Sequence, residues 1–329
     1  MKFEELNQEE QISLLTELVP DLLRQFGMTK CNFENVNHSF NSTFRVTTQD
    51  KQVYALRINI NSQKNPQQIE AEIKWLELLQ QESNVIAPLP RRTTSGEAFA
   101  IVNSEFHTSP LRAVLFGWID GTVVGENPSD EDLFELGSVM AKLQLSSKSL
   151  LQELLREFPL INRTLLNSAD NLHNHDGLFD DEVEGLIFEH FDLVEEVFER
   201  ISVRSKPQLL HADLHTFNTI RTSEGLAIID FDDAGVGLPI QDLVNSIFYM
   251  RENSDREKFV MRGYESKAEI PSISDEEFNL LLVGRQLVLL NDLIKLTTAE
   301  EKEFIPTYIE YTRKRLLNFK ETGKFSLIR

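Results

Sequence analysis

The chain has 329 residues, of which 41% are hydrophobic and 26% are charged, and its formal net charge is −20. This length favours two domains or lobes over one compact core. The acidic balance argues against nucleic acid as a main partner, because binding duplex phosphates needs a basic face. It is compatible with a cationic small substrate, although surface solubility explains it as well.

The sequence predicts a protein of a reducing compartment that has no membrane partner. Cys31 is the single cysteine, which excludes an intrachain disulfide. The N-terminal MKFEELNQEE is acidic and lacks the apolar core of a signal peptide. The most apolar stretch, residues 280 to 290, is short and contains Arg285, which predicts a buried helix. We therefore expect a cytoplasmic protein, and the sequence contains no indication of its oligomeric state.

The first elements predict a helix followed by a β-hairpin. Apolar residues at helical spacing over residues 8 to 26 predict the helix, which Gly27 closes. Pro20 lies inside it, so we expect a kink or a split there. Alternating residues over 40 to 46 and 52 to 58 predict the two strands of the hairpin.

Arg57, near the end of the second strand, is a candidate for binding phosphate. Ala55-Leu56-Arg57 has the form of the kinase strand V-A-I-K, with Arg in place of Lys. A guanidinium keeps the positive charge and offers a planar fork to phosphate oxygens. A helix predicted over residues 67 to 81 supplies the acid that should pair with Arg57. Glu72 lies next to the buried face of this helix, and Glu70 is the alternative.

A polar loop over residues 37 to 42 is the candidate cover for the phosphates. It contains Ser39 and Asn41 but no glycine, so the G-x-G-x-x-G pattern is absent. Its backbone N–H groups and hydroxyls can still contact phosphate. Strands predicted at 98 to 102 and 113 to 116 complete this β-rich part of the chain.

Beyond about residue 122 the pattern becomes helical. Helices are predicted from residue 130 to about 143, and at 148 to 157, 179 to 201, 241 to 251, 275 to 295 and 299 to 319. The sequence therefore predicts an α+β fold with two lobes. The small, β-rich N-terminal lobe spans residues 1–114, a hinge spans 115–121, and a large, mainly α-helical C-terminal lobe spans 122–329.

Polar residues concentrate in the stretch 211 to 233, HADLHTFNTIRTSEGLAIIDFDD. Residues 211 to 218 match the spacing of the kinase catalytic loop H-R-D-L-x-x-x-N. A turn at 222 to 225 and a buried strand at 226 to 229 then deliver Asp230. This layout predicts a magnesium-nucleotide site, and hence a phosphotransferase.

Asp213 is the candidate catalytic residue of this stretch. Phosphoryl transfer needs the acceptor hydroxyl held in line and its proton accepted, and a loop carboxylate can do both. Asn218 and Asp230 offer the hard oxygen ligands that Mg²⁺ prefers. Asp232 or Asp233 either joins the metal site or caps the following helix. His211 is expected to brace the loop rather than act as a base.

Two other interpretations stay open. If residues 211 to 215 formed a strand, His211, Asp213 and His215 would share one face, as the metal ligands of a hydrolase do. That interpretation leaves Asn218 and Asp230 unexplained. A nucleotide-binding pseudokinase would have lost the base or a metal ligand, whereas all three candidate residues are present.

Together these residues resemble the aminoglycoside phosphotransferase and choline kinase superfamily, which has the protein-kinase fold. The loop H-G-D-L-H-x-x-N of that family is matched by residues 211–218, with Ala212 in place of Gly. Its I-D-F-D/E segment is matched by 229–232, and its Pro-x-x-D-L element by 239–243. The resemblance touches most of residues 37 to 250.

The resemblance implies further roles. ATP and Mg²⁺ would be required, and the hinge, with Phe116 and Trp118, would receive adenine. Asp242 would be the buried acid that braces the catalytic loop, and Gln144 stands where His is common.

The acceptor is implied only as a small hydroxylated molecule, such as an amino alcohol, an amino sugar or aminoglycoside, or a homoserine-like compound. Helical segments at 145–205 and 250–329 would build its pocket. Their acids favour an amine-bearing alcohol, although capping and solvation explain most of them. The acids are Asp180, Asp181, Glu182, Glu184, Glu276 and Glu277.

Overall fold

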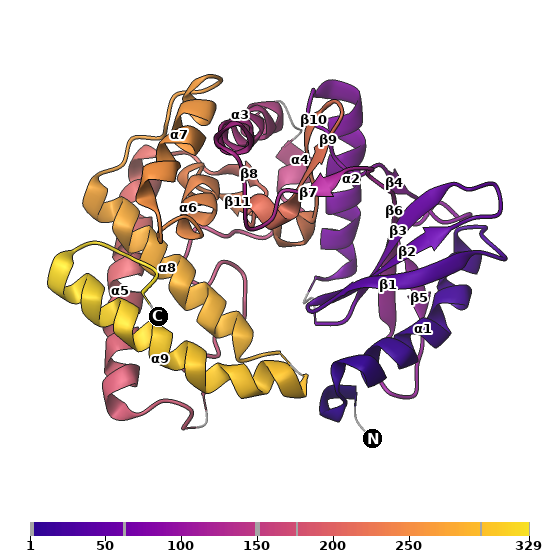
Figure 1. Ribbon diagram of the computed structural model, residues 1–329, viewed down its shortest axis with the longest axis horizontal. Coiled ribbons are helices and arrows are strands. Elements are labelled where there is room, and N and C mark those ends of the chain that lie inside the picture. The colour runs from indigo at the N-terminus through magenta and orange to yellow at the C-terminus, as the bar shows by residue number, and fades with distance from the viewer. Residues whose placement is uncertain (1–2, 62–63, 149–151, 176, 297, 329) are drawn as a thin grey trace. The chain divides into compact units, whose positions relative to one another are not determined.

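The computed structural model describes residues 3–61, 64–148, 152–175, 177–296 and 298–328 (Figure 1). The chain divides into two compact units. The first comprises Met1–Leu78, Pro88–Ile119 and Lys295–Phe304, and the second comprises Leu79–Ala87, Asp120–Ile294 and Ile305–Arg329. The chain passes from the first unit to the second after Ile119, and the hinge at 115–121 stays a prediction. Two short segments belong to the unit opposite to that of the preceding chain: residues 79–87 belong to the second unit, and residues 295–304 belong to the first.

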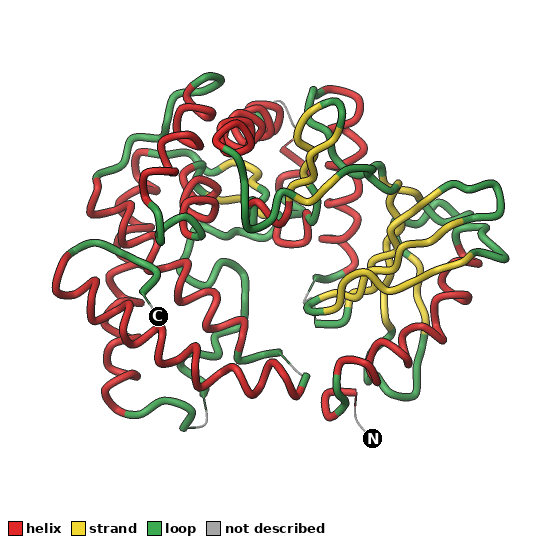
Figure 2. The backbone as a smooth tube through the Cα atoms, in the orientation of Figure 1, coloured by secondary structure: helices red, strands yellow, loops and turns green. Residues whose placement is uncertain are grey.

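The first unit contains one antiparallel sheet, to which six of its described strands belong (Figure 2). The strands lie in the order β1-β2-β3-β6-β4, and β5 pairs with β6. They are β1 (Asn32–His38), β2 (Asn41–Thr47), β3 (Val53–Asn59), β4 (Pro90–Arg91), β5 (Ala100–Val102) and β6 (Leu111–Gly117). The hairpin expected at 40–46 and 52–58 is β2 and β3, in which Thr43 lies opposite Arg57.

Helix α1 (Gln8–Gln25) provides one side of the core of this unit, after a short 3-10 turn, η1 (Phe3–Glu5). Gly27, with φ 73, follows its last turn as predicted. The buried residues Leu15, Val19, Leu22, Phe44, Leu56 and Ile58 form one apolar cluster. The helix continues unbroken through Pro20, so the split expected there does not occur. Pro20 is exposed, and water can therefore bond the carbonyl group that loses its partner.

Helix α2 (Pro66–Glu82) agrees with the helix predicted over residues 67 to 81. Its side chains Ile69, Ile73 and Trp75 are almost fully buried, and so is Glu72. The face of α2 that enters the core thus includes one carboxylate. Figure 1 shows α2 near the strands β4 and β6.

The second unit is mainly helical. Its helices are α3 (Asp130–Ser147), α4 (Gln152–Leu155), α5 (Asp181–Arg204), α6 (Ile240–Phe248), α7 (Glu257–Glu265), α8 (Asp275–Leu293) and most of α9 (Ala299–Thr322). The 3-10 turns are η2 (Thr216–Asn218), η3 (Phe231–Asp233) and η4 (Ser254–Arg256). The helix predicted at 148–157 is confined to α4, although residues 149–151 lie outside the described residues.

Helices α3 and α7 approach each other closely because glycines lie at the contact. A Cβ atom on Gly137 would lie 1.9 Å from the carbonyl oxygen of Val260. A Cβ atom on Gly263 would lie 1.8 Å from the carbonyl oxygen of Phe134. Any larger residue at either position would push the two backbones apart.

Two small antiparallel sheets hold the polar stretch at 211–233. Strands β7 (Thr122–Val123), β9 (Thr219–Thr222) and β10 (Gly225–Ile228) form one, and β8 (Gln208–Leu210) pairs with β11 (Gly235–Gly237) in the other. The loop 211–218 thus begins where β8 ends and stops where β9 starts. Asp230 follows β10 after a single residue.

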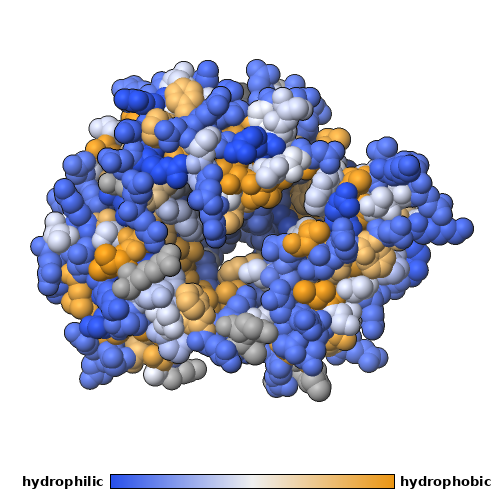
Figure 3. Space-filling model, viewed as in Figure 1, coloured by the Kyte–Doolittle hydropathy of each residue, from blue (hydrophilic) through white to orange (hydrophobic). Residues whose placement is uncertain are grey.

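The described surface is largely polar. Hydrophilic residues cover most of the face that Figure 3 draws. Among the described residues, no helix is both long and apolar enough to cross a bilayer.

Candidate active site

Side chains of helix α6 hold the loop 211–218 in place by hydrogen bonds to its backbone. The carboxylate oxygen Oδ1 of Asp242 accepts a hydrogen bond from the backbone N–H of Ala212 at 2.8 Å. Asn245 donates to the carbonyl oxygen of Ala212, and Ser246 donates to that of Leu214. These contacts hold Ala212 at φ 67, a left-handed conformation that is strained for a residue with a Cβ.

Asp242 is fixed in turn by side chains from α3 and α7. Gln144 Nε2 donates to Asp242 Oδ2 at 3.0 Å, and the hydroxyl of Tyr264 donates to Gln144 Oε1 at 2.6 Å. Burial raises the pKa of Asp242 and raises that of Tyr264 to about 12. Gln144, where the resembled family often has His, is thus the link between Asp242 and Tyr264.

His211 joins the loop to the segment that carries Asp230. It is fully buried, and its Nε2 lies 3.0 Å from the carbonyl oxygen of Ile229. Its ring packs against Phe231 at a centroid distance of 4.8 Å. Burial lowers the pKa of His211, although Asp242 and Asp213 act in the opposite direction. A neutral, buried imidazole with a backbone partner fits the bracing role expected for His211.

Asp213 lies among hydrogen-bond donors. Its Oδ1 accepts from the guanidinium of Arg285, and its Oδ2 lies 3.0 Å from Asn218 Nδ2 and 3.3 Å from His215 Nε2. Burial by itself would raise the pKa of Asp213, but the charge of Arg285, together with His215 and His211, holds it well below its usual range. Asp213 is therefore an ionised carboxylate at neutral pH.

Arg285 belongs to this site, but the sequence offered no sign of that beyond a charge inside an apolar helix. It lies in the middle of α8 with its side chain 6% exposed. Besides Asp213, it donates to the hydroxyl of Tyr249 at 3.1 Å. Burial lowers the pKa of Arg285, but Tyr249 and Asp213 more than offset this, and its pKa is raised.

Asn218 and Asp230 are brought together by the backbone. The side-chain nitrogen Nδ2 of Asn218 donates to the backbone carbonyl oxygen of Asp213 at 2.8 Å. The side-chain oxygen of Asn218 is thereby turned away from Asp213. The carbonyl oxygen of Asn218 accepts from the N–H of Ile229 at 3.0 Å. Asp230 follows at φ 63, a second left-handed non-glycine residue in this stretch.

Asp230, Asp232 and Asp233 lie in one short segment shortly after β10. Burial raises the pKa of Asp233 well above its usual value, and the charges of Asp213, Asp232, Asp230 and Asp292 raise it further. Asn218 and Asp230, which the Ile229 N–H bond to the Asn218 carbonyl oxygen brings close along the backbone, offer one amide oxygen and one carboxylate, and Mg²⁺ takes few protein ligands of this kind while it keeps waters and phosphate oxygens. The residues present therefore fit a magnesium ion.

The first unit contains the predicted cation and its acid. Arg57 Nη2 lies 2.9 Å from Glu72 Oε2, and both side chains are buried. Lys64, which the sequence did not single out, approaches the same oxygen of Glu72 at 3.0 Å. Glu70 instead pairs with Arg92 at 3.0 Å, which decides between the two acids.

The remaining candidates for nucleotide binding also lie in the first unit. Ser39 and Asn41 are at the tip of the β1–β2 hairpin, where the Ser39 N–H donates to the Asn41 carbonyl oxygen at 3.0 Å. Phe116 is buried on β6, with the guanidinium of Arg57 5.4 Å from its ring centre. The backbone N–H of Trp118 donates to the carbonyl oxygen of Val53 at 3.2 Å.

The strand on which the hydrolase interpretation depends does not form. Residues 211–215 are a loop, because the left-handed Ala212 interrupts the alternation of side chains. His211 points to a backbone carbonyl, whereas His215 lies beside Asp213. Among the described residues, no group of three His, Cys, Asp or Glu side chains is arranged to hold a metal ion.

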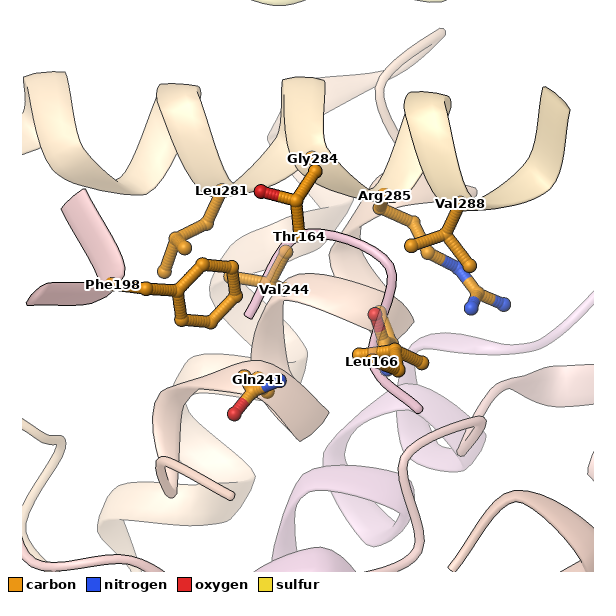
Figure 4. A pocket seen from close by; sticks show the side chains of 10 residues that line it. Thr164, Leu166, Phe198, Gln241, Val244, Leu281, Gly284, Arg285 and Val288 are labelled. Carbon is orange, nitrogen blue, oxygen red and sulfur yellow. The ribbon is translucent and has the colours of Figure 1, made fainter. Parts of the chain in front are cut away.

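A small cavity lies behind the site in the second unit. It has a volume of about 20 Å³ and is lined by residues that include Thr164, Phe198, Gln241, Leu281 and Arg285. This volume accommodates about one water molecule, and not an acceptor. Figure 4 shows that the guanidinium of Arg285 points away from Phe198 and Leu281.

Comparison with known proteins gives a consistent result. A family model described as the phosphotransferase enzyme family matches residues 34–266. No curated protein matches the chain at a significant level.

Several solved structures share its fold at low sequence identity. A microcompartment-associated aminopropanol kinase has 19% identity and a TM-score of 0.73, over 95% of this chain and all of its own. Amicoumacin kinase, solved with AMP-PNP, Ca²⁺ and its antibiotic, has 16% identity and a TM-score of 0.68, over 93% of each chain. Choline kinase from Cryptosporidium parvum has 12% identity and a TM-score of 0.63, over 94% of this chain and 97% of its own.

Proposed function

Because the chain belongs to the phosphotransferase enzyme family and has the two-lobed fold of its kinases, it is a small-molecule kinase, and we propose that it transfers the γ-phosphate of ATP to a hydroxyl group of a small molecule. The observation that carries this proposal is the folded loop 211–218, in which Asn218 bonds both the backbone and the carboxylate of Asp213. If Asp213 only capped a turn, the side-chain amide of Asn218 would not be needed to hold it.

Asp213 is the residue that orients the acceptor. Its carboxylate accepts a hydrogen bond from the acceptor hydroxyl and aims the hydroxyl oxygen at the γ-phosphorus atom. The new bond forms between these two atoms, the bond from the γ-phosphorus to the bridging oxygen breaks, and ADP leaves. The hydroxyl proton passes to Asp213 as the new bond forms. Since Arg285 keeps Asp213 ionised, the carboxylate can accept the hydrogen bond that orients the hydroxyl.

Mg²⁺ is held, in this proposal, by Asn218 and Asp230. The chemistry that it supplies when bound is neutralisation of charge on the phosphate oxygens. The bond from Ile229 N–H to the carbonyl oxygen of Asn218 fixes Asn218 beside the segment that carries Asp230. Asp232 and Asp233, which follow Asp230 on η3, are further candidate ligands.

In the first unit, Arg57 binds the phosphates of ATP, and Glu72 holds the Arg57 side chain in place. The ion pair at 2.9 Å supports this role for Glu72 rather than Glu70. Ser39 and Asn41 supply polar groups to the phosphates, and Phe116 and Trp118 contact the adenine. The backbone N–H of Trp118 already donates to Val53. Trp118 therefore contributes its side chain or its backbone carbonyl oxygen to the nucleotide.

The acceptor in this proposal is an alcohol that also carries an amine. Its support comes from similar structures, which include an aminopropanol kinase and a choline kinase. Three of the acids that first favoured an amine already have partners within the protein. Asp180 caps α5 through the N–H of Val183, Glu184 pairs with His175, and Glu277 caps α8 and pairs with Arg204.

The deciding experiment measures ATP consumption over a panel of hydroxylated compounds. The panel contains 1-amino-2-propanol, choline, homoserine, spectinomycin and other aminoglycosides, with glycerol and simple sugars as acceptors without an amine. We expect turnover with at least one amino alcohol or amino sugar and none in an Asp213→Ala variant. Full turnover by Asp213→Ala would remove Asp213 from its role.

A second measurement separates the kinase from a pseudokinase. Binding of ADP is followed by calorimetry with and without Mg²⁺. Binding without phosphoryl transfer to any acceptor, and without ATP hydrolysis, would support a nucleotide-binding pseudokinase. Turnover with acceptors that lack an amine, and with no others, would be consistent with a kinase but would contradict the proposed class of acceptor.

A further inference from the structure

Asp213 belongs to a closed ring of four side chains, with Arg285, Tyr249 and His215. Arg285 donates to Asp213 Oδ1 and lies 3.1 Å from the hydroxyl of Tyr249. The ring of Tyr249 packs against that of His215 at a centroid distance of 4.7 Å. His215 Nε2 closes the circuit at 3.3 Å from Asp213 Oδ2. Every member contacts two others.

The ring connects three separate parts of the second unit. Asp213 and His215 lie on the loop 211–218, Tyr249 immediately follows α6, and Arg285 lies in the middle of α8. A movement of any one of these segments would therefore shift the carboxylate of Asp213. The two carboxylate oxygens are contacted separately, Oδ1 by Arg285 and Oδ2 by His215 and Asn218. A carboxylate accepts about four hydrogen bonds, so an acceptor hydroxyl can still bind.

Stability does not explain a buried arginine at this position. Many of the neighbouring residues of α8 are apolar and buried, among them Leu281, Leu282, Leu287 and Val288. Among the described residues, the buried Nε of Arg285 has no hydrogen-bond partner. Burying a guanidinium is costly, and a well-packed apolar residue in place of such a pair is often equally or more stable. The arrangement thus points to a role at Asp213.

We propose that Arg285 is a positioning residue for phosphoryl transfer, which holds the carboxylate of Asp213 in the orientation that the acceptor hydroxyl needs. This inference rests on the proposed kinase function. The same guanidinium nitrogen, Nη2, donates to Asp213 and to the hydroxyl of Tyr249, so Tyr249 helps to fix its position. Displacing a reacting group by about 1 Å can lower a rate about 100-fold, which is the scale of effect expected here.

The test uses hydrolysis of MgATP without an acceptor, in which water takes the place of the acceptor hydroxyl. Wild type is compared with Arg285→Gln, Arg285→Lys, Asp213→Asn and the double variant Asp213→Asn/Arg285→Gln. Affinity for ADP is measured on each. Arg285→Gln should lower the hydrolysis rate at least about 10-fold and change the ADP dissociation constant less than about 2-fold. Arg285→Lys should recover part of the rate, because it keeps the charge but not the planar fork.

The double variant separates positioning from a general structural effect. If Arg285 acts through Asp213, Arg285→Gln should cause no further loss once Asp213 is Asn. Additive losses, or a wild-type rate in Arg285→Gln, would overturn the proposal. Arg313→Gln, which breaks an ion pair with Glu310 on α9, is the matched control and should hydrolyse ATP normally. A wild-type protein that neither binds ADP nor hydrolyses ATP would overturn the proposed function instead.

Discussion

Arg57 and Glu72 form a buried ion pair, with Arg57 Nη2 2.9 Å from Glu72 Oε2 and side chains 7% and 0% exposed. The sequence left Glu70 and Glu72 as alternatives, because both lie near the start of the same helix. The structure assigns them to different partners, since Glu70 pairs with Arg92 at 3.0 Å. These two acids, two residues apart, provide a matched pair of variants.

Glu72→Gln is expected to impair the use of ATP, whereas Glu70→Gln is not. Replacing Glu72 removes the counter-charge that holds the buried Arg57, and we expect kcat/KM for ATP to fall about 10-fold or more. Glu70 and Arg92 are both partly exposed, so the loss of their pair should change activity by less than about 2-fold. Steady-state ATP kinetics measures both. Equal effects of the two variants would contradict the assignment of Glu72.

Ala212→Gly is expected to stabilise the protein. Ala212 has φ 67, a conformation that costs about 1–2 kcal/mol for a residue with a Cβ and little for Gly. The extra freedom of Gly in the unfolded chain costs about 0.5–1 kcal/mol in return. The free energy of unfolding should therefore rise by about 0.5–1 kcal/mol. Ala234→Gly is the control, because Ala234 is buried at φ −54 and should become less stable. Chemical denaturation of the two variants tests this prediction.

Local sequence patterns predicted most of the elements. The hairpin was predicted to within one or two residues, because alternation fixes which side chains face the core. The start of α8 at Asp275 is encoded by the capping box of Ser274 and Glu277. Helix α7 was missed, because Gly263 weakens a helical pattern. Gly263 allows α7 to pack closely against α3. This contact is visible only in the tertiary structure.

The candidate site could be predicted only where its members are close in sequence. Asp213, Asn218 and Asp230 lie in one stretch whose spacing is typical of kinases. Arg285 lies 72 residues from Asp213, and a charge in an apolar helix does not identify its partner. Lys64 was also missed, since a lysine in a loop normally indicates a solvated surface.

The stability of the protein should fall as the pH falls below about 6.5, in part because of His211. Burial lowers the pKa of His211, so the folded protein keeps it neutral while the unfolded chain binds a proton below pH 6.5. A histidine that stays neutral in the folded protein lowers the free energy of unfolding by about 1.4 kcal/mol between pH 7.5 and 5.5. His190 is also buried with a lowered pKa and adds to the same trend.

His211→Gln separates the two histidines. Gln can still donate to the carbonyl oxygen of Ile229 but does not titrate. Urea unfolding at pH 7.5 and 5.5 should therefore show a smaller pH effect in His211→Gln than in wild type, by up to about 1.4 kcal/mol. An unchanged pH effect would mean that His211 is not neutral in the folded protein.

Asp230→Asn is expected to raise the Mg²⁺ concentration that half-saturates ADP binding. Asn keeps the size of the side chain but loses the charge that attracts a divalent cation, so an increase of about 10-fold or more follows. Affinity for ADP in the absence of Mg²⁺ should change little, or increase slightly as repulsion of the phosphates decreases. Asp255→Asn, on η4 of the same unit, is the control for a general loss of negative charge. Calorimetric titration of ADP at several Mg²⁺ concentrations measures the effect, and an unchanged Mg²⁺ requirement would exclude Asp230 as a ligand.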